Sequence, residues 1–174
     1  MNSDEINKER LAIVGEAKSW IGTPFLHARN VKGAGGDCQS IITNPFGVVF
    51  NRVIEVPAYS SQWHLHAGED GDVRELYIDT LLKNNCIEIR GVDWEVEPYD
   101  ENLYVDAAVE PGDIVLARMG RTYCHGGIVI NWPDIIQAES KVCGRGSVQL
   151  ANADASWYMS GRPKKFFSWK NWHD

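Results

Sequence analysis

The chain has 174 residues, a formal net charge of −7, 44% hydrophobic residues and 10% aromatic residues. This composition excludes a disordered protein, and the excess of acidic residues argues against nucleic acid or another polyanion as the main partner. The length fits one domain, which we expect to span residues 1–174.

The N-terminal sequence and the cysteine spacing narrow the class further. The first ten residues, MNSDEINKER, lack the apolar segment of a secretory signal, and no apolar run approaches the length of a membrane span. Four cysteines stand at positions 38, 86, 124 and 143 without the CxxC or Cys/His spacing of a zinc site. We therefore expect synthesis in the cytoplasm, and no membrane span, metal or cofactor.

The N-terminal part of the chain is predicted to be helical. Apolar residues recur at helical spacing over residues 3–21, and Ser3 can cap the first turn. A second helix is predicted from about residue 38 to residue 43. Pro45 disfavours its continuation, so we expect that helix to kink or to restart at residues 46–50.

The rest of the chain alternates strand signals with turns. Predicted strands cover residues 86–92, 114–118, 124–131, 134–139, 147–151 and 162–169. A helix is predicted over residues 73–82, and residues 93–110 have no clear period and are expected to form a loop. The strands before and after the turn at residues 131–134 are predicted to pair as a hairpin. The last strand is expected to close the sheet, with Lys164 and Lys165 exposed.

A glycine-rich stretch leads into the first candidate functional residue. Glycines at positions 33, 35 and 36 precede Asp37, a plausible helix N-cap, and Cys38 follows in the first turn. The positive end of a helix favours thiolate over thiol, which is the setting of a nucleophilic cysteine. The alternative is that Cys38 packs as a small apolar side chain. His27, in the connector before this stretch, is expected to be exposed without a function.

A histidine and a glutamine on the predicted hairpin can complete a catalytic group with Cys38. His125 begins one strand and Gln137 lies on its partner, so they can be neighbours on one face, although the sequence leaves the register open. In a thiol peptidase the histidine accepts the thiol proton, and the third residue orients the imidazole. A histidine bound to a backbone carbonyl and a solvent-facing glutamine fit the sequence equally well. Cys124 points to the opposite face of a regular strand and is expected in the core.

Five short motifs, in this order, resemble those of the NlpC-type cysteine peptidases. They are Gly22-Thr23-Pro24-Phe25, Gly36-Asp37-Cys38, Pro111-Gly112-Asp113-Ile114, His125-Gly126-Gly127-Ile128-Val129-Ile130 and Gln137-Ala138. The segment Pro57-Ala58-Tyr59-Ser60-Ser61-Gln62-Trp63 is similar to one in phage-encoded members. Proteins of this family have a compact papain-like fold and cleave peptide stems of the bacterial cell wall. The resemblance implies an α+β domain in which the cysteine-bearing helix packs on an antiparallel sheet.

The resemblance also implies a role for each matching residue. Cys38 corresponds to the nucleophile, His125 to the base and Gln137 to the third polar residue. The backbone N–H of Cys38 would contribute to an oxyanion hole. Asp37 would contact the free amine of the substrate, and Phe25 and Trp63 would join it in binding.

The chain departs from the family pattern in four respects. Gln39-Ser40 follows the cysteine where the family often has a small pair such as Ser-Gly. Phe25 stands where the family commonly has tyrosine, which predicts that no hydroxyl lies near the nucleophile. Gln137 takes a position that is often histidine. The separation between Cys38 and His125 is long, which predicts an insertion over residues 51–110 that shapes or covers the cleft.

The sequence therefore predicts a cysteine peptidase that hydrolyses an amide bond in a small peptide or murein fragment. One alternative is a non-catalytic phage tail or assembly component on the same fold, and another is acyl transfer through the same thiol. Lacking a signal peptide, the protein would be delivered to the cell wall by another route or carried in a phage particle. The oligomeric state and the bond cleaved stay open.

Overall fold

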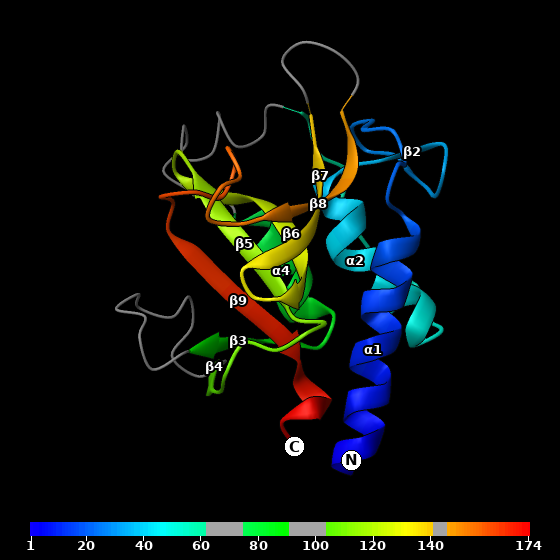
Figure 1. Ribbon diagram of the computed structural model, residues 1–174, viewed down its shortest axis with the longest axis vertical. Coiled ribbons are helices and arrows are strands. Elements are labelled where there is room, and N and C mark those ends of the chain that lie inside the picture. Colours follow the sequence, from blue (N-terminus) through cyan, green and yellow to red (C-terminus); the bar gives the residue numbers. More distant parts are fainter. Residues whose placement is uncertain (62–74, 91–103, 141–145) are drawn as a thin grey trace.

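The computed structural model describes residues 1–61, 75–90, 104–140 and 146–174 (Figure 1). Its helices are α1 (Ser3–Ser19), α2 (Cys38–Val49), α4 (Leu76–Lys83) and the 3-10 helix η1 (Lys170–Trp172). A small separate sheet consists of β1 (Asn30–Val31) and β2 (Gly35–Gly36). The strands of the main sheet are β3 (Cys86–Arg90), β4 (Tyr104–Asp106), β5 (Ile114–Met119), β6 (Thr122–Asn131), β7 (Asp134–Glu139), β8 (Ser147–Asn152) and β9 (Lys164–Trp169).

The main sheet has the strand order β4-β3-β9-β5-β6-β7-β8. Among these described strands only β3 and β4 pair in parallel, and the other neighbours are antiparallel. Helix α2 packs on β6 and β7, α1 packs against α2, and α4 contacts β3 and β6. Figure 1 shows α1 and α2 side by side along the sheet, with both chain termini at the same end. The predicted α+β class, with the cysteine-bearing helix on an antiparallel sheet, is confirmed.

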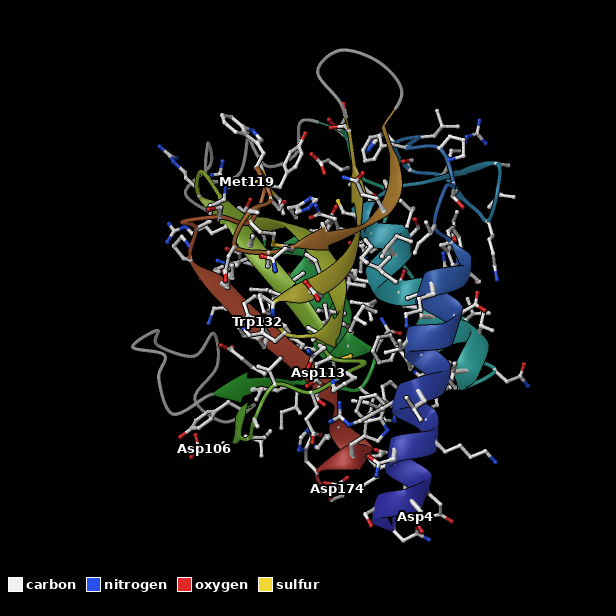
Figure 2. All side chains as sticks on the ribbon, in the orientation of Figure 1. Asp4, Asp106, Asp113, Met119, Trp132 and Asp174 are labelled. Carbon is white, nitrogen blue, oxygen red and sulfur yellow. The ribbon has the colours of Figure 1, made fainter. Side chains whose placement is uncertain are left out.

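Apolar side chains cover both faces of the sheet, and they fill the space between it and the helices (Figure 2). Leu116 and Ile128 belong to the larger cluster under the helices, whereas their chain neighbours Val115 and Val129 belong to the cluster on the opposite face. This alternation is what a pleated strand imposes, and all four side chains are fully buried. Each such burial stabilises the fold by about 1.5–3 kcal/mol.

The first helix forms where it was predicted, with a different cap. The side chain of Asn2 accepts a hydrogen bond from the Glu5 N–H at 2.9 Å, and a Glu5 carboxylate oxygen accepts one from the Asn2 N–H at 3.1 Å. This reciprocal capping box makes Asn2 the N-cap, so the prediction of Ser3 was wrong. The helix ends at Ser19, and Trp20 is its C-cap.

Helix α2 runs without a break from Cys38 to Val49, so the predicted kink or restart at Pro45 was wrong. A proline inside a helix removes one backbone hydrogen bond. Ile42 and Phe46, on either side of it in sequence, are both buried in the core beneath the helix. Tertiary packing of this apolar face outweighs the local preference of proline.

Strands β6 and β7 form the predicted hairpin, and their register places the two candidate catalytic residues. Gln137 pairs with Gly127, which lies two positions beyond His125 and therefore on the same face of β6. His125 and Gln137 are thus diagonal neighbours across the hairpin. A side chain at position 127 would have its Cβ 2.6 Å from the Ile136 carbonyl oxygen, so this close pairing requires glycine.

Three predictions for the sheet were wrong. Strand β9 lies between β3 and β5 in the interior of the sheet and closes no edge. Lys165, expected to be exposed, is buried, and its Nζ lies 2.6 Å from an Oε1 of Glu88 on β3. Residues 104–106 form β4 within the range predicted as loop, because they pair with β3.

Some predictions fall outside the described residues. These are Trp63, the first residues of the helix predicted over residues 73–82 and the end of the strand predicted over residues 86–92. The described remainder of that helix is α4, and the described remainder of that strand is β3. No helix within the described ranges has both the length and the apolar character needed to cross a membrane.

Candidate active site

Cys38 stands at the first position of α2, where the local sequence fixes the backbone. Asp37 is the N-cap, as predicted, and its Oδ1 accepts from the Ser40 N–H at 3.0 Å while the Ser40 hydroxyl accepts from the Asp37 N–H at 2.8 Å. A Cβ on Gly36 would lie 2.9 Å from the Ser40 Oγ, so a side chain there would displace the hydroxyl that takes part in this cap. The Cys38 side chain is half-buried.

His125 is held by a direct hydrogen bond to Gln137. The Nε2 of the imidazole lies 2.8 Å from the Gln137 Oε1, and both side chains are buried. The amide of Gln137 is itself oriented, because its Nε2 donates to the Ser156 hydroxyl at 3.0 Å and to a Glu139 carboxylate oxygen at 3.3 Å. Its carbonyl oxygen therefore faces the histidine and accepts the proton of Nε2. The other ring nitrogen, Nδ1, then carries the lone pair that a general base needs.

An aromatic ring confines the imidazole from one side. Tyr158 stacks on His125 with ring centroids 4.8 Å apart and an angle of 26° between the planes. The Tyr158 hydroxyl donates to the Ser140 carbonyl oxygen at 2.8 Å, which ties the ring to the end of β7. The short segment that carries Ser156 and Tyr158 thus supports both members of the His125–Gln137 pair.

Cys38 and His125 line the same cleft, which has a volume of about 290 Å³. The Cys38 sulfur lies 3.8 Å from the carbonyl oxygen of Cys124, the residue before His125. Phe25 and Asp37 also line the cleft. Gln137 is connected to the cleft through its hydrogen bond to His125. The structure therefore brings together all the predicted site residues that it describes, and Trp63 lies outside the described ranges.

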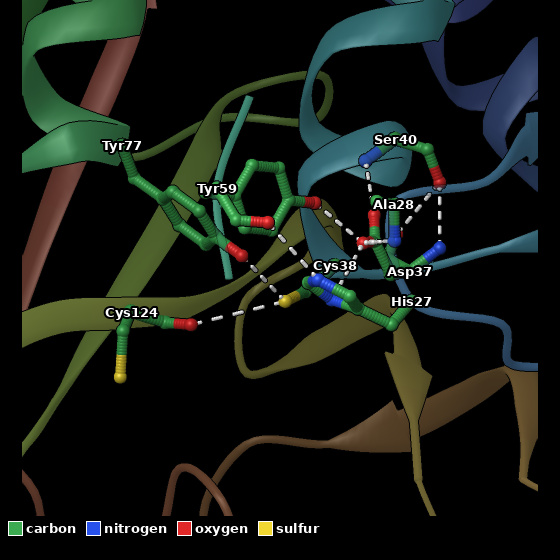
Figure 3. Close-up of polar contacts among 8 residues, drawn as sticks. All are labelled: His27, Ala28, Asp37, Cys38, Ser40, Tyr59, Tyr77 and Cys124. Carbon is green, nitrogen blue, oxygen red and sulfur yellow. Dashed lines mark hydrogen bonds and ion pairs between the residues drawn. The ribbon is translucent and has the colours of Figure 1, made fainter. Parts of the chain in front are cut away.

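Two tyrosines that were assigned no role from the sequence also reach the site. The Tyr77 hydroxyl lies 3.0 Å from the Cys38 sulfur, and the Tyr59 hydroxyl donates to the Asp37 Oδ2 (Figure 3). The expectation that no hydroxyl lies near the nucleophile was therefore wrong. Its basis was Phe25 alone, whereas these hydroxyls come from residues 22 and 39 positions after Asp37 and Cys38.

His27 is exposed, as expected, but it also lines the cleft. Its Nδ1 lies 3.8 Å from the Asp37 Oδ2, and its Nε2 lies 3.2 Å from the Tyr59 carbonyl oxygen. Cys124 is buried, as expected, and also contributes to the cleft wall. Within the described ranges no group of three or more His, Cys, Asp or Glu side chains is arranged to hold a metal ion.

Burial sets the protonation states of Cys38 and His125. Desolvation, followed by the negative charge of Asp37, raises the pKa of the Cys38 thiol to about 12. Desolvation also lowers the pKa of His125 to about 4, against a smaller opposing effect of the bond to Gln137. The helix terminus was expected to favour a thiolate, but burial disfavours the charged form of either group. At neutral pH the thiol and the imidazole in this cleft are therefore both neutral.

This neutral pair predicts how Cys38 reacts with iodoacetamide. Alkylation follows the thiolate fraction, so its rate is expected to rise about tenfold per pH unit from pH 7 to pH 10, without a plateau near neutrality. Subtraction of the rate of the Cys38→Ala variant removes the contribution of the other cysteines. A rate that is already level between pH 6 and pH 8 would show a preformed thiolate–imidazolium pair and contradict the prediction.

Comparison with known proteins bears on the fold. No protein-family model matches the sequence, and no curated protein matches it significantly. Among solved structures, the crystal structure of the NlpC/p60 domain of the peptidoglycan hydrolase SagA is similar, with a TM-score of 0.50 and 17% sequence identity. The similarity covers 90% of this chain and 96% of that chain. At this identity it shows the fold, so the chain has an α+β fold like that of an NlpC/p60 domain.

Proposed function

We propose that this protein is a cysteine peptidase that hydrolyses an amide bond in a short peptide, with stem peptides of the bacterial cell wall as its substrates. The convergence of Cys38 and His125 in one cleft, with the imidazole held by Gln137, carries the proposal. The similarity in fold to a domain of a peptidoglycan hydrolase supports the choice of substrate class.

Acylation begins with the neutral pair. The Cys38 sulfur attacks the carbonyl carbon of the scissile amide while Nδ1 of His125 takes the thiol proton, so that proton transfer accompanies formation of the S–C bond. The imidazolium then gives this proton to the leaving nitrogen as the C–N bond breaks. A water molecule, activated by the same imidazole, hydrolyses the remaining thioester and restores the thiol.

Gln137 keeps the imidazole in the tautomer that this sequence of steps requires. Its carbonyl oxygen accepts from Nε2 in every protonation state of His125, and its amide is anchored by Ser156. Glutamine carries no charge, so it orients the ring without the electrostatic stabilisation of imidazolium that a carboxylate provides.

Asp37 is the proposed contact for a free amine of the substrate. Its Oδ1 is engaged by the Ser40 N–H, and its Oδ2 accepts from the Ala28 N–H at 2.7 Å and from the Tyr59 hydroxyl. The substrate ammonium would replace the Tyr59 hydroxyl as the donor, with the gain of a charge-assisted bond. Phe25 supplies an apolar wall of the same cleft.

Purified muropeptides with intact peptide stems test the proposal. Incubation with the protein is expected to give two fragments whose masses sum to the mass of the substrate plus one water. Tandem mass spectrometry of the fragments then identifies the bond. A fragment that carries an added amine in place of water would instead reveal acyl transfer.

A non-catalytic component of a phage tail or another assembly is the second candidate function. One observation favours it: in this structure tyrosine hydroxyls already form hydrogen bonds with both the Cys38 sulfur and the Asp37 carboxylate. Failure to cleave any muropeptide, by protein that is folded and whose Cys38 can be alkylated, would favour this function over the peptidase.

A further inference from the structure

We propose that Tyr77 is a catalytic residue of this site, whose hydroxyl donates a hydrogen bond to the carbonyl oxygen of the acyl group as negative charge develops on it. This inference deepens the proposed peptidase function and rests on it. It assigns to helix α4 a chemical role in addition to its place in the core.

The position of the Tyr77 hydroxyl is the first argument. Tyr77 is on α4, and its side chain is 2% exposed, so the ring is held by its surroundings on all sides. Tyr59 packs edge-on against it, with ring centroids 6.4 Å apart. The hydroxyl emerges from this packing at 3.0 Å from the Cys38 sulfur, within the lining of the cleft (Figure 3). A donor fixed in this way needs no reorganisation during the reaction.

The geometry of thiol attack is the second argument. When sulfur bonds to a carbonyl carbon, the oxygen on that carbon becomes anionic one bond away from the new S–C bond. A donor that stabilises such an oxyanion lies about 2.7–3.1 Å from it. A hydroxyl within hydrogen-bond distance of the sulfur is within reach of that oxygen. The N–H of Cys38, in the first turn of α2, would be the second donor.

The protonation of Tyr77 is the third argument. Burial raises the pKa of its hydroxyl well above the ordinary value, and the nearby Cys38, Tyr59 and Asp37 act in the same direction. The hydroxyl therefore keeps its proton at neutral pH and can donate it in a hydrogen bond. In a site with little water such a bond to a developing charge is stronger than in solution.

The step balances without any further reactant. One electron pair of sulfur forms the S–C bond, the carbonyl π pair moves onto oxygen, and the thiol proton moves to Nδ1 of His125. Tyr77 donates a hydrogen bond to the oxyanion and keeps its proton. When the carbonyl re-forms, the C–N bond breaks and the leaving nitrogen takes the proton from His125.

Two reactions of the same thiol separate this role from thiol activation. Acylation of Cys38 by p-nitrophenyl acetate passes through an oxyanion, and release of p-nitrophenolate reports it. Alkylation by iodoacetamide displaces iodide and forms no oxyanion. Loss of a donor to the oxyanion therefore slows the first reaction much more than the second, whereas loss of a group that only polarises or positions the sulfur slows both alike.

The Tyr77→Phe variant removes the hydroxyl and keeps the ring. Its acylation rate is expected to fall about 10²-fold, and its alkylation rate only a few-fold. With a cleavable muropeptide, kcat is expected to fall by a similar factor while KM changes little. The matched control is Tyr123→Phe, because Tyr123 is buried in the same core but does not line the cleft. Circular dichroism confirms that both variants are folded.

Two results would overturn the proposal: an acylation rate within threefold of the wild type, or equal losses in acylation and alkylation. Equal losses would mean that Tyr77 only polarises or positions the thiol. The assay also separates this inference from the proposed substrate, because p-nitrophenyl acetate requires no recognition of a peptide. A protein that cleaves no muropeptide but loses acylation specifically in Tyr77→Phe would leave Tyr77 assigned and the substrate class wrong.

Discussion

The Cys38→Ala variant is expected to lose peptide hydrolysis by about 10⁴-fold or more while keeping its fold. Alanine offers no nucleophile, and the residues that act with a nucleophile contribute little without it. Cys38 is half-buried at the first position of α2, and the Asp37–Ser40 capping box that begins this helix does not involve its side chain. The free energy of unfolding of the Cys38→Ala variant is therefore expected to differ from that of the wild type by less than about 1 kcal/mol.

The Cys86→Ala variant is the matched control for this loss. Cys86 is also a free cysteine, but it is buried in the core on β3 and does not line the cleft. Its removal should leave turnover near the wild-type value. Hydrolysis retained by Cys38→Ala would mean that another group attacks the substrate. Cys124 would then be the first to examine, because it is the other described cysteine among the residues that line the cleft.

The parts of this site that could be predicted from the sequence are those set by short-range rules. Asp37 before Cys38 has the residue type of an N-cap, and the cap forms through contacts three residues apart. The hairpin between β6 and β7 likewise follows from two apolar runs around one turn. Its register, which the sequence left open, is fixed by the side chains that the two strands bury on both faces of the sheet.

The tyrosines could not be predicted, because their contacts depend on how distant segments pack. Tyr77 occurs among the apolar residues of an amphipathic helix, where an aromatic side chain is more often part of the core. It is part of the core, and only its hydroxyl reaches the sulfur. No periodicity distinguishes a core tyrosine that ends at a reactive atom from one that does not.

The same difference between local and long-range interactions explains why the raised pKa of Cys38 was not predicted. The helix terminus is a local feature that the sequence shows, and it favours the thiolate. Burial by the surrounding fold is a tertiary feature, and it raises the pKa of the thiol and so disfavours the thiolate. The placement of β9 was missed for a related reason, because the pairing of β9 with β3 and β5 joins segments far apart in the chain.

Replacing Arg10 by leucine is expected to lower the free energy of unfolding by about 3 to 5 kcal/mol, because it leaves a buried carboxylate without its countercharge. The Arg10 Nη1 donates to the Asp113 Oδ1 at 2.7 Å, and both side chains are buried. Asp113 lies at the foot of β5 between the sheet and α1 (Figure 2). This pair therefore ties the first helix to the sheet and gives a physical reason for the Pro111-Gly112-Asp113 motif.

The loss of stability in the Arg10→Leu variant is expected to depend on pH. Burial raises the pKa of Asp113 in the folded protein, and the charge of Arg10 opposes that rise. A carboxyl whose pKa is higher in the folded state than in the unfolded chain favours folding at low pH and loses that contribution as pH rises through the folded-state pKa. Without Arg10 this pKa rises further. The deficit of the variant should therefore shrink as the pH is lowered from 7 towards 4.

Urea denaturation of Arg10→Leu and of Lys8→Leu at pH 7 and at pH 4.5 measures both effects. Lys8 is an exposed cation on the same helix, so its replacement removes the same charge without affecting a buried partner. A deficit below about 1 kcal/mol at pH 7 would place the Arg10–Asp113 pair in the range of exposed ion pairs. A deficit that is equal at the two pH values would show that packing of the Arg10 side chain against Trp172, and not the charge of Asp113, is what the substitution removes.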